Sequence, residues 1–169
     1  MKSLYKKIIL SAALAAVGLA GAYAEEYLSA ADLTAGAITA ALEAEGFTVY
    51  ARSDKNVTVE AMDPGRTAAD GEVFTARIKL NGGGAVDFRS IGFSAKTGAV
   101  VTIYLNSSSK TDARVLKVTD EAGNVLAELV APPDVGAVAG TATFTVPKDG
   151  KYFVFSAASG INIYLIDIE

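Results

Sequence analysis

The sequence predicts an all-β fold, a two-sheet antiparallel β-sandwich that is jelly-roll-like. Short segments of alternating polar and apolar residues recur about every ten residues, they are rich in Val, Ile, Thr and Tyr, and turn-forming residues separate them. The expected strands are 47–50, 57–61, 74–80, 90–94, 100–105, 114–119, 125–130, 141–146, 152–156 and 161–168.

Two of the connections have clear turn chemistry. Residues 120–124, with the sequence DEAGN, separate two alternating runs and predict a hairpin loop in which Gly123 or Asn124 takes a positive φ. Residues 63–66, with the sequence DPGR, have proline followed by glycine, which is typical of a type II turn. Both connections fit a chain of consecutive antiparallel strands.

Residues 36–45 leave two alternatives open. Their sequence, GAITAALEAE, consists of good helix formers and is followed by Gly46, a residue that can end a helix. Propensity alone therefore favours a helix, in a chain where the surrounding segments predict strands.

The first 24 residues have the three parts of a secretory signal peptide. Lys2, Lys6 and Lys7 form a basic start, residues 8–21 are apolar, and Ala22-Tyr23-Ala24 is a typical cleavage site. The alternative is a membrane anchor, but the apolar run is about 14 residues long, too short to span roughly 30 Å of hydrocarbon. We therefore expect an exported protein, extracellular, on the cell surface or periplasmic, with residues 25–169 as a single domain and no membrane insertion after cleavage.

Charge and composition exclude several classes of function. Without residues 1–24, twelve basic and nineteen acidic residues give a net charge of −7, which argues against nucleic acid or anionic lipid as a partner. The chain has no His and no Cys, so Ser-His and Cys-His catalysis and ordinary zinc sites are excluded. No pair of acids stands out as a glycosidase pair, and we expect no enzyme. A structural calcium held by loop oxygens remains an alternative, although no spacing resembles a defined calcium loop.

The stretch RIKLNGGGAVDFRS, residues 77–90, places three cations around a glycine-rich bend. On a strand over residues 74–80, Arg77 and Lys79 point outward together, roughly 7 Å apart. Arg89 follows the bend, and an irregularity near Ser90 would also turn it outward. Either these cations pair with acids such as Glu72 and Asp87, or they bind an anionic ligand such as a uronic acid, whose carboxylate suits arginine.

The last segment, GINIYLIDI over residues 160–168, alternates and is apolar on both faces. This pattern predicts a central strand of the sandwich. Ile161, Ile163 and Leu165 would share one face, and Asn162 and Tyr164 would share the other. A second interpretation is that Asn162 and Tyr164 face a ligand.

Several of these segments together resemble a β-sandwich module of secreted bacterial polysaccharide lyases, found beside pectate-lyase catalytic domains. The segments are ADLTAGAITA, GFTVYARSDKNVTVE, FTARIKLNGGG, FRSIGF and FTVPKDGKYFVFSAASGINIYLIDIE, and the resemblance extends from Ala31 to Glu169. Such modules are regarded as non-catalytic and carbohydrate-binding-like. The resemblance rests on the overall pattern rather than on one diagnostic motif.

The resemblance implies a set of contact residues and one further strand. Its basic positions correspond to Lys55 in the SDKNVTVE turn, to Arg77 and Lys79, and to Arg89. It also implies a strand over residues 37–42, against the helix propensity there. The chain departs from the pattern because no catalytic domain accompanies the module, so the targeting role of a lyase accessory domain does not transfer intact.

Two functions from different classes follow. The first is a secreted, non-catalytic carbohydrate-binding module for acidic, pectin-like polysaccharide, with Lys55, Arg77, Lys79 and Arg89 as the contacts. The second is a structural or assembly subunit of a filament or surface layer, in which residues 25–33 add a strand to the open edge of a neighbouring molecule.

Overall fold

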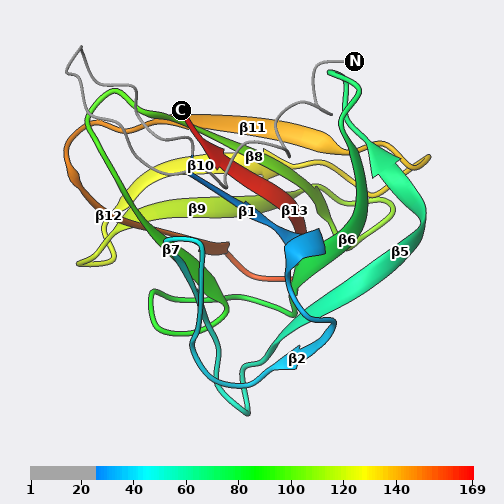
Figure 1. Ribbon diagram of the computed structural model, residues 1–169, viewed down its shortest axis with the longest axis horizontal. Coiled ribbons are helices and arrows are strands. Elements are labelled where there is room, and N and C mark those ends of the chain that lie inside the picture. Colours follow the sequence, from blue (N-terminus) through cyan, green and yellow to red (C-terminus); the bar gives the residue numbers. More distant parts are fainter. Residues whose placement is uncertain (1–25) are drawn as a thin grey trace, which may run out of the picture.

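The computed structural model describes residues 26–169, so the predicted signal peptide, residues 1–24, lies outside the described residues. The described chain is a sandwich of two antiparallel sheets (Figure 1), which confirms the predicted fold class. One single-turn 3-10 helix, η2 (Ala30–Asp32), accompanies the strands. Within residues 26–169 there is no helix long and apolar enough to cross a membrane.

Each sheet contains strands from both halves of the described chain. The seven-stranded sheet contains, in spatial order, β11 (Gly140–Thr145), β8 (Val100–Ser107), β13 (Ile161–Ile168), β6 (Val73–Leu80), β5 (Val57–Thr67) and β2 (Gly36–Ile38), with β1 (Glu26–Ser29) also paired to β13. The six-stranded sheet contains β10 (Val125–Ala131), β9 (Arg114–Asp120), β12 (Gly150–Ser156), β7 (Ser90–Ala95), β4 (Phe47–Tyr50) and β3 (Leu42–Ala44). All ten expected strands are therefore present, and β9 and β10 pair as the predicted hairpin.

The core lies between the two sheets because one face of each strand is apolar. Phe93 is at its centre, with its ring 5.8 Å from that of Phe47 and 6.1 Å from that of Tyr152. Ile78 and Ile103 pack in the same cluster from the opposite sheet. The alternating partners of these residues consequently face outward, where they are free to form a site.

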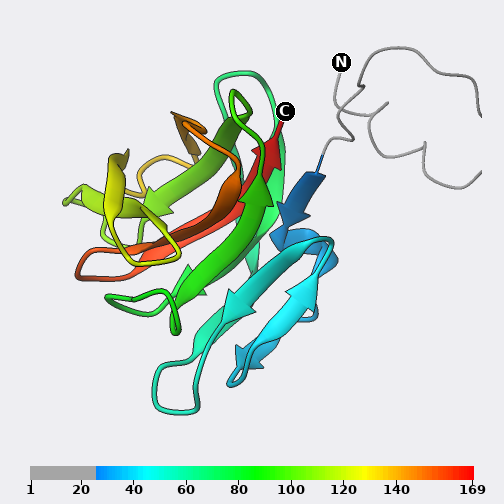
Figure 2. The same cartoon turned by 90° about the vertical axis from the view of Figure 1, so that its left-hand side faces the viewer.

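Residues 36–45 form neither a helix nor one strand. β2 pairs with β5 in one sheet, whereas β3 pairs with β4 in the other, so this segment crosses between the sheets along one side of the sandwich (Figure 2). Gly36 and Gly46 take positive φ values of 136° and 83° at its two ends, which glycine allows at little cost. Pairing with β4 and β5 overrides helix propensity here, and the strand implied for 37–42 is correct only at its ends.

The expected type II turn at residues 63–66 is wrong. These residues lie within β5, in an irregular stretch between the Ala61–Ala76 pair and the Arg66–Phe74 pair, so four residues of β5 face one residue of β6. Such an excursion redirects side chains. A Cβ on Gly65 would lie 2.5 Å from the carbonyl oxygen of Phe74, which explains a glycine at this close approach.

β13 is a central strand, as predicted, with β8 on one side and β6 and β1 on the other. Its alternation changes phase at Tyr164, because the pairing with β8 shifts between Ile163 and Leu165. Ile161 and Ile163 face the core before the shift, and Ile166 and Ile168 face it afterwards. The prediction that Leu165 shares a face with Ile161 and Ile163 is therefore wrong, whereas Tyr164 lies away from the main core, as Asn162 does.

Candidate functional site

The candidate site is the outer face of the seven-stranded sheet, where polar residues replace the apolar ones of the core. Thr58, Lys79, Asn162 and Asn106 form one row across β5, β6, β13 and β8, each directly paired with the next. Directly paired residues on one face have Cβ atoms about 4.5–5.5 Å apart, so their side chains can interact. This row joins two regions that differ in how fully their polar groups are bonded.

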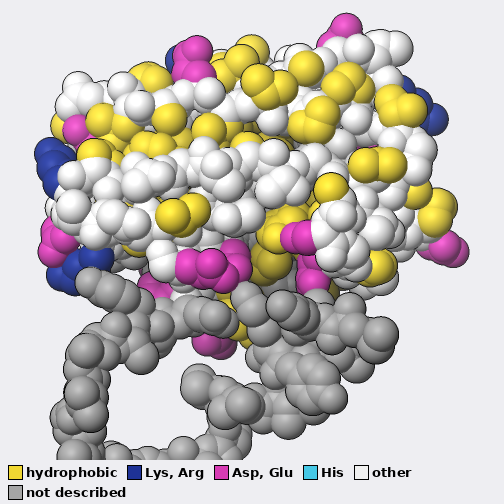
Figure 3. Space-filling model, turned by 90° about the horizontal axis from the view of Figure 1, so that it is seen from above, with side chains coloured by type: hydrophobic (Ala, Val, Ile, Leu, Met, Phe, Trp, Pro, Cys, Tyr) yellow, Lys and Arg dark blue, Asp and Glu magenta, His cyan; other side chains and the backbone are white. Residues whose placement is uncertain are grey.

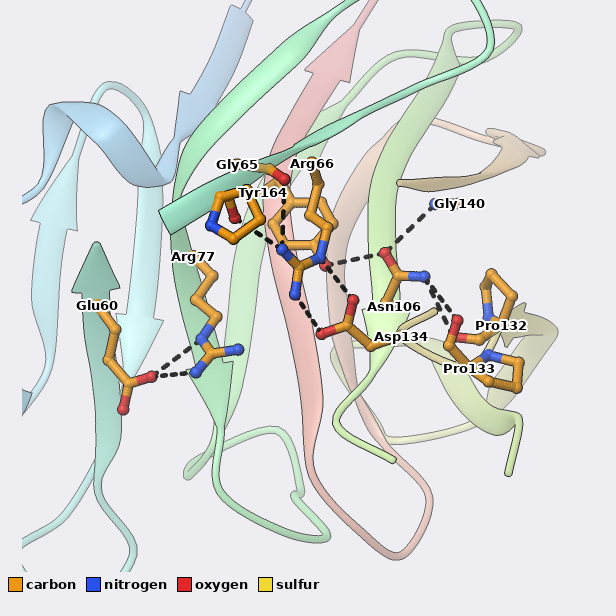
Figure 4. A network of polar contacts seen from close by, with 11 residues as sticks. Glu60, Gly65, Arg66, Arg77, Asn106, Pro132, Pro133, Asp134, Gly140 and Tyr164 are labelled. Carbon is orange, nitrogen blue, oxygen red and sulfur yellow. Dashed lines mark hydrogen bonds and ion pairs between the residues drawn. The ribbon is translucent and has the colours of Figure 1, made fainter. Parts of the chain in front are cut away.

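The first region is held by an ion pair between Arg66 and Asp134, here called the clasp (Figure 4). The Arg66 Nε and Nη2 atoms lie 2.6 and 2.9 Å from the two carboxylate oxygens of Asp134. A third nitrogen, Nη1, donates to the carbonyl oxygens of Pro64 and Gly65 at 2.8 and 3.3 Å. The Asp134 carboxylate raises the pKa of Arg66, and both side chains are less than one fifth exposed.

Asn106 lies beneath the clasp and uses its whole amide. Its Nδ2 atom donates to the carbonyl oxygens of Pro132 and Pro133 at 3.4 and 3.1 Å. Its Oδ1 atom accepts from the Tyr164 hydroxyl at 2.8 Å and from the Gly140 amide at 3.4 Å. An asparagine amide has two donor hydrogens and two acceptor lone pairs, so Asn106 has no capacity left.

Aromatic rings complete this region. Phe74 packs with its ring 5.0 Å from Tyr104 and 5.5 Å from Tyr164, forming a second small apolar cluster on the outer face. Burial raises the pKa of both tyrosines, and Tyr104 donates a 2.6 Å hydrogen bond to Asp70, which lowers the pKa of that carboxyl group. The region is thus built as a structural unit whose polar groups are bonded.

The second region begins at the centre of the row, with Asn162. Its side chain is fully buried, yet neither Nδ2 nor Oδ1 has a hydrogen-bond partner. Its neighbour Asn106 cannot supply one, because the Asn106 amide is fully used. Buried polar groups are normally bonded, so this amide calls for an explanation.

Arg77 and Lys79 lie beside Asn162 on β6 and share one acid. The Arg77 Nε and Nη2 atoms lie 2.9 and 2.6 Å from Oε2 of Glu60, whereas the Lys79 ammonium is 3.6 Å from Oε1 of the same side chain. The hydrogen bond from Arg77 is the main cause of a lowered Glu60 pKa. Two cations with one carboxylate leave an excess positive charge, and both remain partly exposed, at 24% and 33%.

Two further predicted cations lie in the loops before β5 and after β6. Arg89 has a left-handed φ of 47° and donates through Nε to the carbonyl oxygen of Asn56 at 3.2 Å, next to Lys55. Asn81 donates to the same carbonyl at 3.3 Å and to Thr58 at 2.8 Å. The Asn56 carbonyl oxygen therefore links Arg89 to Asn81, and Asn81 bonds Thr58, the residue paired with Lys79.

The glycine-rich bend has a packing role beside Arg89. A Cβ on Gly82 would lie 2.7 Å from the Arg89 Nη1 atom, and a Cβ on Gly84 would lie 2.5 Å from the Arg89 carbonyl oxygen. The bend therefore needs small residues to hold Arg89 in place, in addition to the turn predicted for it.

The four predicted residues, Lys55, Arg77, Lys79 and Arg89, are here called the cationic band: Arg77 and Lys79 share Glu60, Arg89 bonds the Asn56 carbonyl oxygen, and Lys55 precedes Asn56 in the chain. The partner acid is Glu60 rather than the expected Glu72 or Asp87, and Asp87 instead pairs with Arg52. Among the described residues, Lys55 and Arg89 form no ion pair. Their role as ligand contacts stays a prediction.

The sequence did not point to Arg66, Asp134 or Asn106. The Asp-Pro-Gly-Arg motif predicts a turn, whereas Arg66 lies in β5 and its side chain reaches Asp134. The available signal was the apolar and proline-rich context of Asp134, an acid next to Pro132-Pro133 between two strands. In the part of the chain that the structure describes, no group of three or more acidic side chains is placed to hold a metal ion, so the calcium alternative has no carboxylate cluster there.

Comparisons with known proteins give similarity without membership of a family. A family model described as the bacterial pre-peptidase C-terminal domain matches residues 87–154, less than half of the chain. No curated protein matches the sequence of this chain.

Similar solved structures include several carbohydrate-binding modules. A family 35 carbohydrate-binding module from Clostridium thermocellum is 15% identical, with 86% of this chain and 98% of that chain covered and a TM-score of 0.49. The module CsCBM6-3 from Clostridium stercorarium, in complex with cellobiose, is 9% identical, with coverage of 85% and 92% and a TM-score of 0.45.

The CBM22-1 xylan-binding domain of Paenibacillus barcinonensis Xyn10C is 13% identical, with coverage of 86% and 92% and a TM-score of 0.44. Similarity at these identities and scores does not transfer a ligand to this chain. Neither the family model nor these three modules are described as part of a pectate lyase, so the link to lyases stays a prediction.

Proposed function

We propose that this chain is an exported, non-catalytic carbohydrate-binding module for acidic, pectin-like polysaccharide. One observation carries the proposal. Arg89 and Asn81 share the Asn56 carbonyl oxygen, and Asn81 bonds Thr58, the residue paired with Lys79. Within residues 26–169, Glu60 is the acid that pairs with Arg77 and Lys79. A local excess of positive charge in an otherwise acidic chain attracts anionic ligands.

The position of the band suits an extended anionic chain. Arg77 and Lys79 stand on β6, Lys55 lies just before β5 and Arg89 lies between β6 and β7, so the charges extend from a strand into the loops at one end of the sheet. A uronic acid polymer presents carboxylates at regular intervals along its length. Arginine and lysine bind such groups by charge-assisted hydrogen bonds, arginine with a two-pronged geometry.

The pairing with Glu60 limits the expected affinity. Arg77 must exchange its carboxylate partner or share it, so part of the attraction is already used within the protein. The charges are partly exposed and therefore screened by salt. We expect weak binding that falls steeply as the ionic strength rises.

Affinity electrophoresis in native gels tests the proposal. The mature chain, residues 25–169, is run in gels containing polygalacturonate, and its migration is compared with that in gels containing fully methyl-esterified pectin, which has the same backbone without the charges. Retardation by polygalacturonate that disappears on esterification or in high salt is the expected result. Unchanged migration with pectins of every degree of esterification would show the proposal to be wrong.

A second function, assembly into a filament or surface layer, is favoured by a different side of the molecule. The edge strands β10 and β11 contact each other, and several large apolar residues on β10 and in the following loop are exposed. They are Val125, Leu126, Val130, Val135 and Val138. Figure 3 views the molecule from the side of β11, where many hydrophobic side chains lie at the surface, with charged ones among them.

The N-terminal segment assigned to assembly is already paired in this structure. β1 lies along β13 of its own sheet, and Leu28 is buried in the core. Assembly through this segment would thus require exchange of β1 between molecules. Size-exclusion chromatography with light scattering on the mature chain checks it: polymers support assembly, and a strict monomer at high concentration contradicts it.

A further inference from the structure

Asn162 has an environment that the fold alone does not account for. Like Asn106 in the same polar row it is fully buried, but both polar atoms of its side chain lack partners. Its strand neighbours Ile161 and Ile163 point into the core, so the amide points to the same outer face as the cationic band. An amide in this position offers donors and an acceptor that no described residue uses.

We propose that Asn162 is a specificity-determining residue of the acidic-polysaccharide site, binding a hydroxyl group of a uronic acid residue whose carboxylate is bound by Lys79 and Arg77. This inference rests on the proposed function and adds a contact to an uncharged group of the sugar, its hydroxyl, to the contacts with the carboxylate. A hydroxyl group both donates and accepts a hydrogen bond, which is what a free amide complements.

The two strand neighbours of Asn162 differ in how firmly their side chains are held. On β8, Asn106 is fixed by four hydrogen bonds and cannot turn towards Asn162 or away from it. On β6, the Lys79 ammonium is 3.6 Å from Glu60, beyond hydrogen-bond length, and its side chain is 33% exposed. Lys79 is therefore held to Glu60 less closely than Arg77 is, and the proposal requires Lys79 to turn towards the ligand carboxylate and the buried Asn162 amide to become exposed on binding.

The spacing also fits one sugar residue. Asn162 and Lys79 are directly paired across β13 and β6, and the distance between such side chains is comparable with the width of one pyranose ring. One uronic acid residue can therefore reach the ammonium with its carboxylate and the amide with a ring hydroxyl. The charge alone would hold any anion, whereas the amide distinguishes a sugar acid from a simple carboxylate or sulfate.

The test compares two buried asparagines that lie side by side. Asn162→Leu removes an amide that has no protein partner, so the ligand-free protein is expected to melt about 2–4 °C higher. The matched variant Asn106→Leu removes an amide with four hydrogen bonds and is expected to melt lower. If a buried water instead satisfied Asn162 as part of the fold, Asn162→Leu would also melt lower, and the proposal would be overturned.

Binding is measured with oligogalacturonides by isothermal titration at low and high salt. Asn162→Leu, with Asn162→Ala as the smaller alternative, is expected to weaken binding about 3- to 10-fold, by a similar factor at both salt concentrations, because a hydroxyl contact is neutral. Lys79→Ala should weaken binding mainly at low salt.

The outcomes separate the two proposals. If the wild-type protein does not bind oligogalacturonides, the proposed function is wrong and the role of Asn162 is wrong with it. If the wild type binds and both Asn162 variants bind equally well, only the role of Asn162 is wrong, and the cationic band remains as the site.

Discussion

The two halves of the outer face use the same residue types in opposite ways. On the clasp side, Arg66 has its own acid and Asn106 has four hydrogen bonds. On the cationic side, Arg77 shares Glu60 with Lys79, and the side chain of Asn162 has no hydrogen-bond partner among the described residues. The two halves meet between β8 and β13, whose asparagines are direct neighbours.

The difference separates groups that hold the fold from groups that are available to a ligand. A buried ion pair with all its hydrogen bonds made contributes to structure, and breaking it leaves an uncompensated charge. A cation with a shared acid, or an amide without a partner, retains capacity for binding. Bonding state, rather than residue type, thus assigns a role to each side chain here.

The largest effect is expected where the bonds are complete. Asp134→Ala leaves Arg66 unpaired in a site where it is 16% exposed, and we expect the free energy of unfolding to fall by about 2–3 kcal/mol. Urea denaturation followed by circular dichroism measures it. A loss below about 0.5 kcal/mol would show that the clasp does not hold β5 to the loop between β10 and β11. Binding to polygalacturonate should change little in the folded variant, because the cationic band is untouched.

A smaller effect of the opposite kind is expected on the cationic side. Glu60→Gln removes the acid that Arg77 and Lys79 share, and it should strengthen binding to polygalacturonate about 3- to 10-fold at low salt. The cause is the release of both cations to the ligand. Affinity electrophoresis with a series of polygalacturonate concentrations gives the change in affinity. Weaker binding would mean that Glu60 positions Arg77 for the ligand rather than competing with it.

The sequence predicted most of the fold because alternation and turns are local signals. The ten expected strands are present, since each alternating run buries one face. Residues 36–45 escaped this approach because their two strands are only three residues each and belong to different sheets, and the partner of β2, Val57 to Val59, lies about 20 residues further along the chain. Long-range pairing of this kind leaves no local pattern in the sequence.

The candidate site was predictable only in part, for a similar reason. Arg77 and Lys79 could be placed on one face of β6 from their spacing, because a strand repeats every two residues. Their partner Glu60 lies directly opposite Arg77 on β5, a register that the sequence does not encode locally. Arg66 and Asp134 are 68 residues apart, and the irregular stretch of β5 that brings them together resembled a turn.

The pH dependence of stability distinguishes Glu60 from an unpaired acid. Arg77 lowers the pKa of Glu60 below its ordinary value of 4.5, so the unfolded chain binds this proton at a higher pH than the folded one. The stabilisation is complete above that value and is lost as the pH falls through the folded-state pKa. The stability difference between the wild type and Glu60→Gln should therefore shrink between about pH 5 and pH 3. A difference that does not vary with pH in this range would contradict the pairing.

The smallest effect is expected at an ion pair outside both regions. Arg52 and Asp87 pair on the surface, where their side chains are 49% and 57% exposed, and Arg52 also lies over the Phe88 ring at 5.1 Å. Exposed pairs contribute little because water screens them, so Asp87→Ala should change the free energy of unfolding by less than about 0.5 kcal/mol. Because Asp87 stands near Arg89 in the sequence, its removal should raise affinity for polygalacturonate slightly, and less than Glu60→Gln does. An equal gain from both variants would mean that net charge governs binding, and the band defined by Glu60, Arg77 and Lys79 would lose its special role.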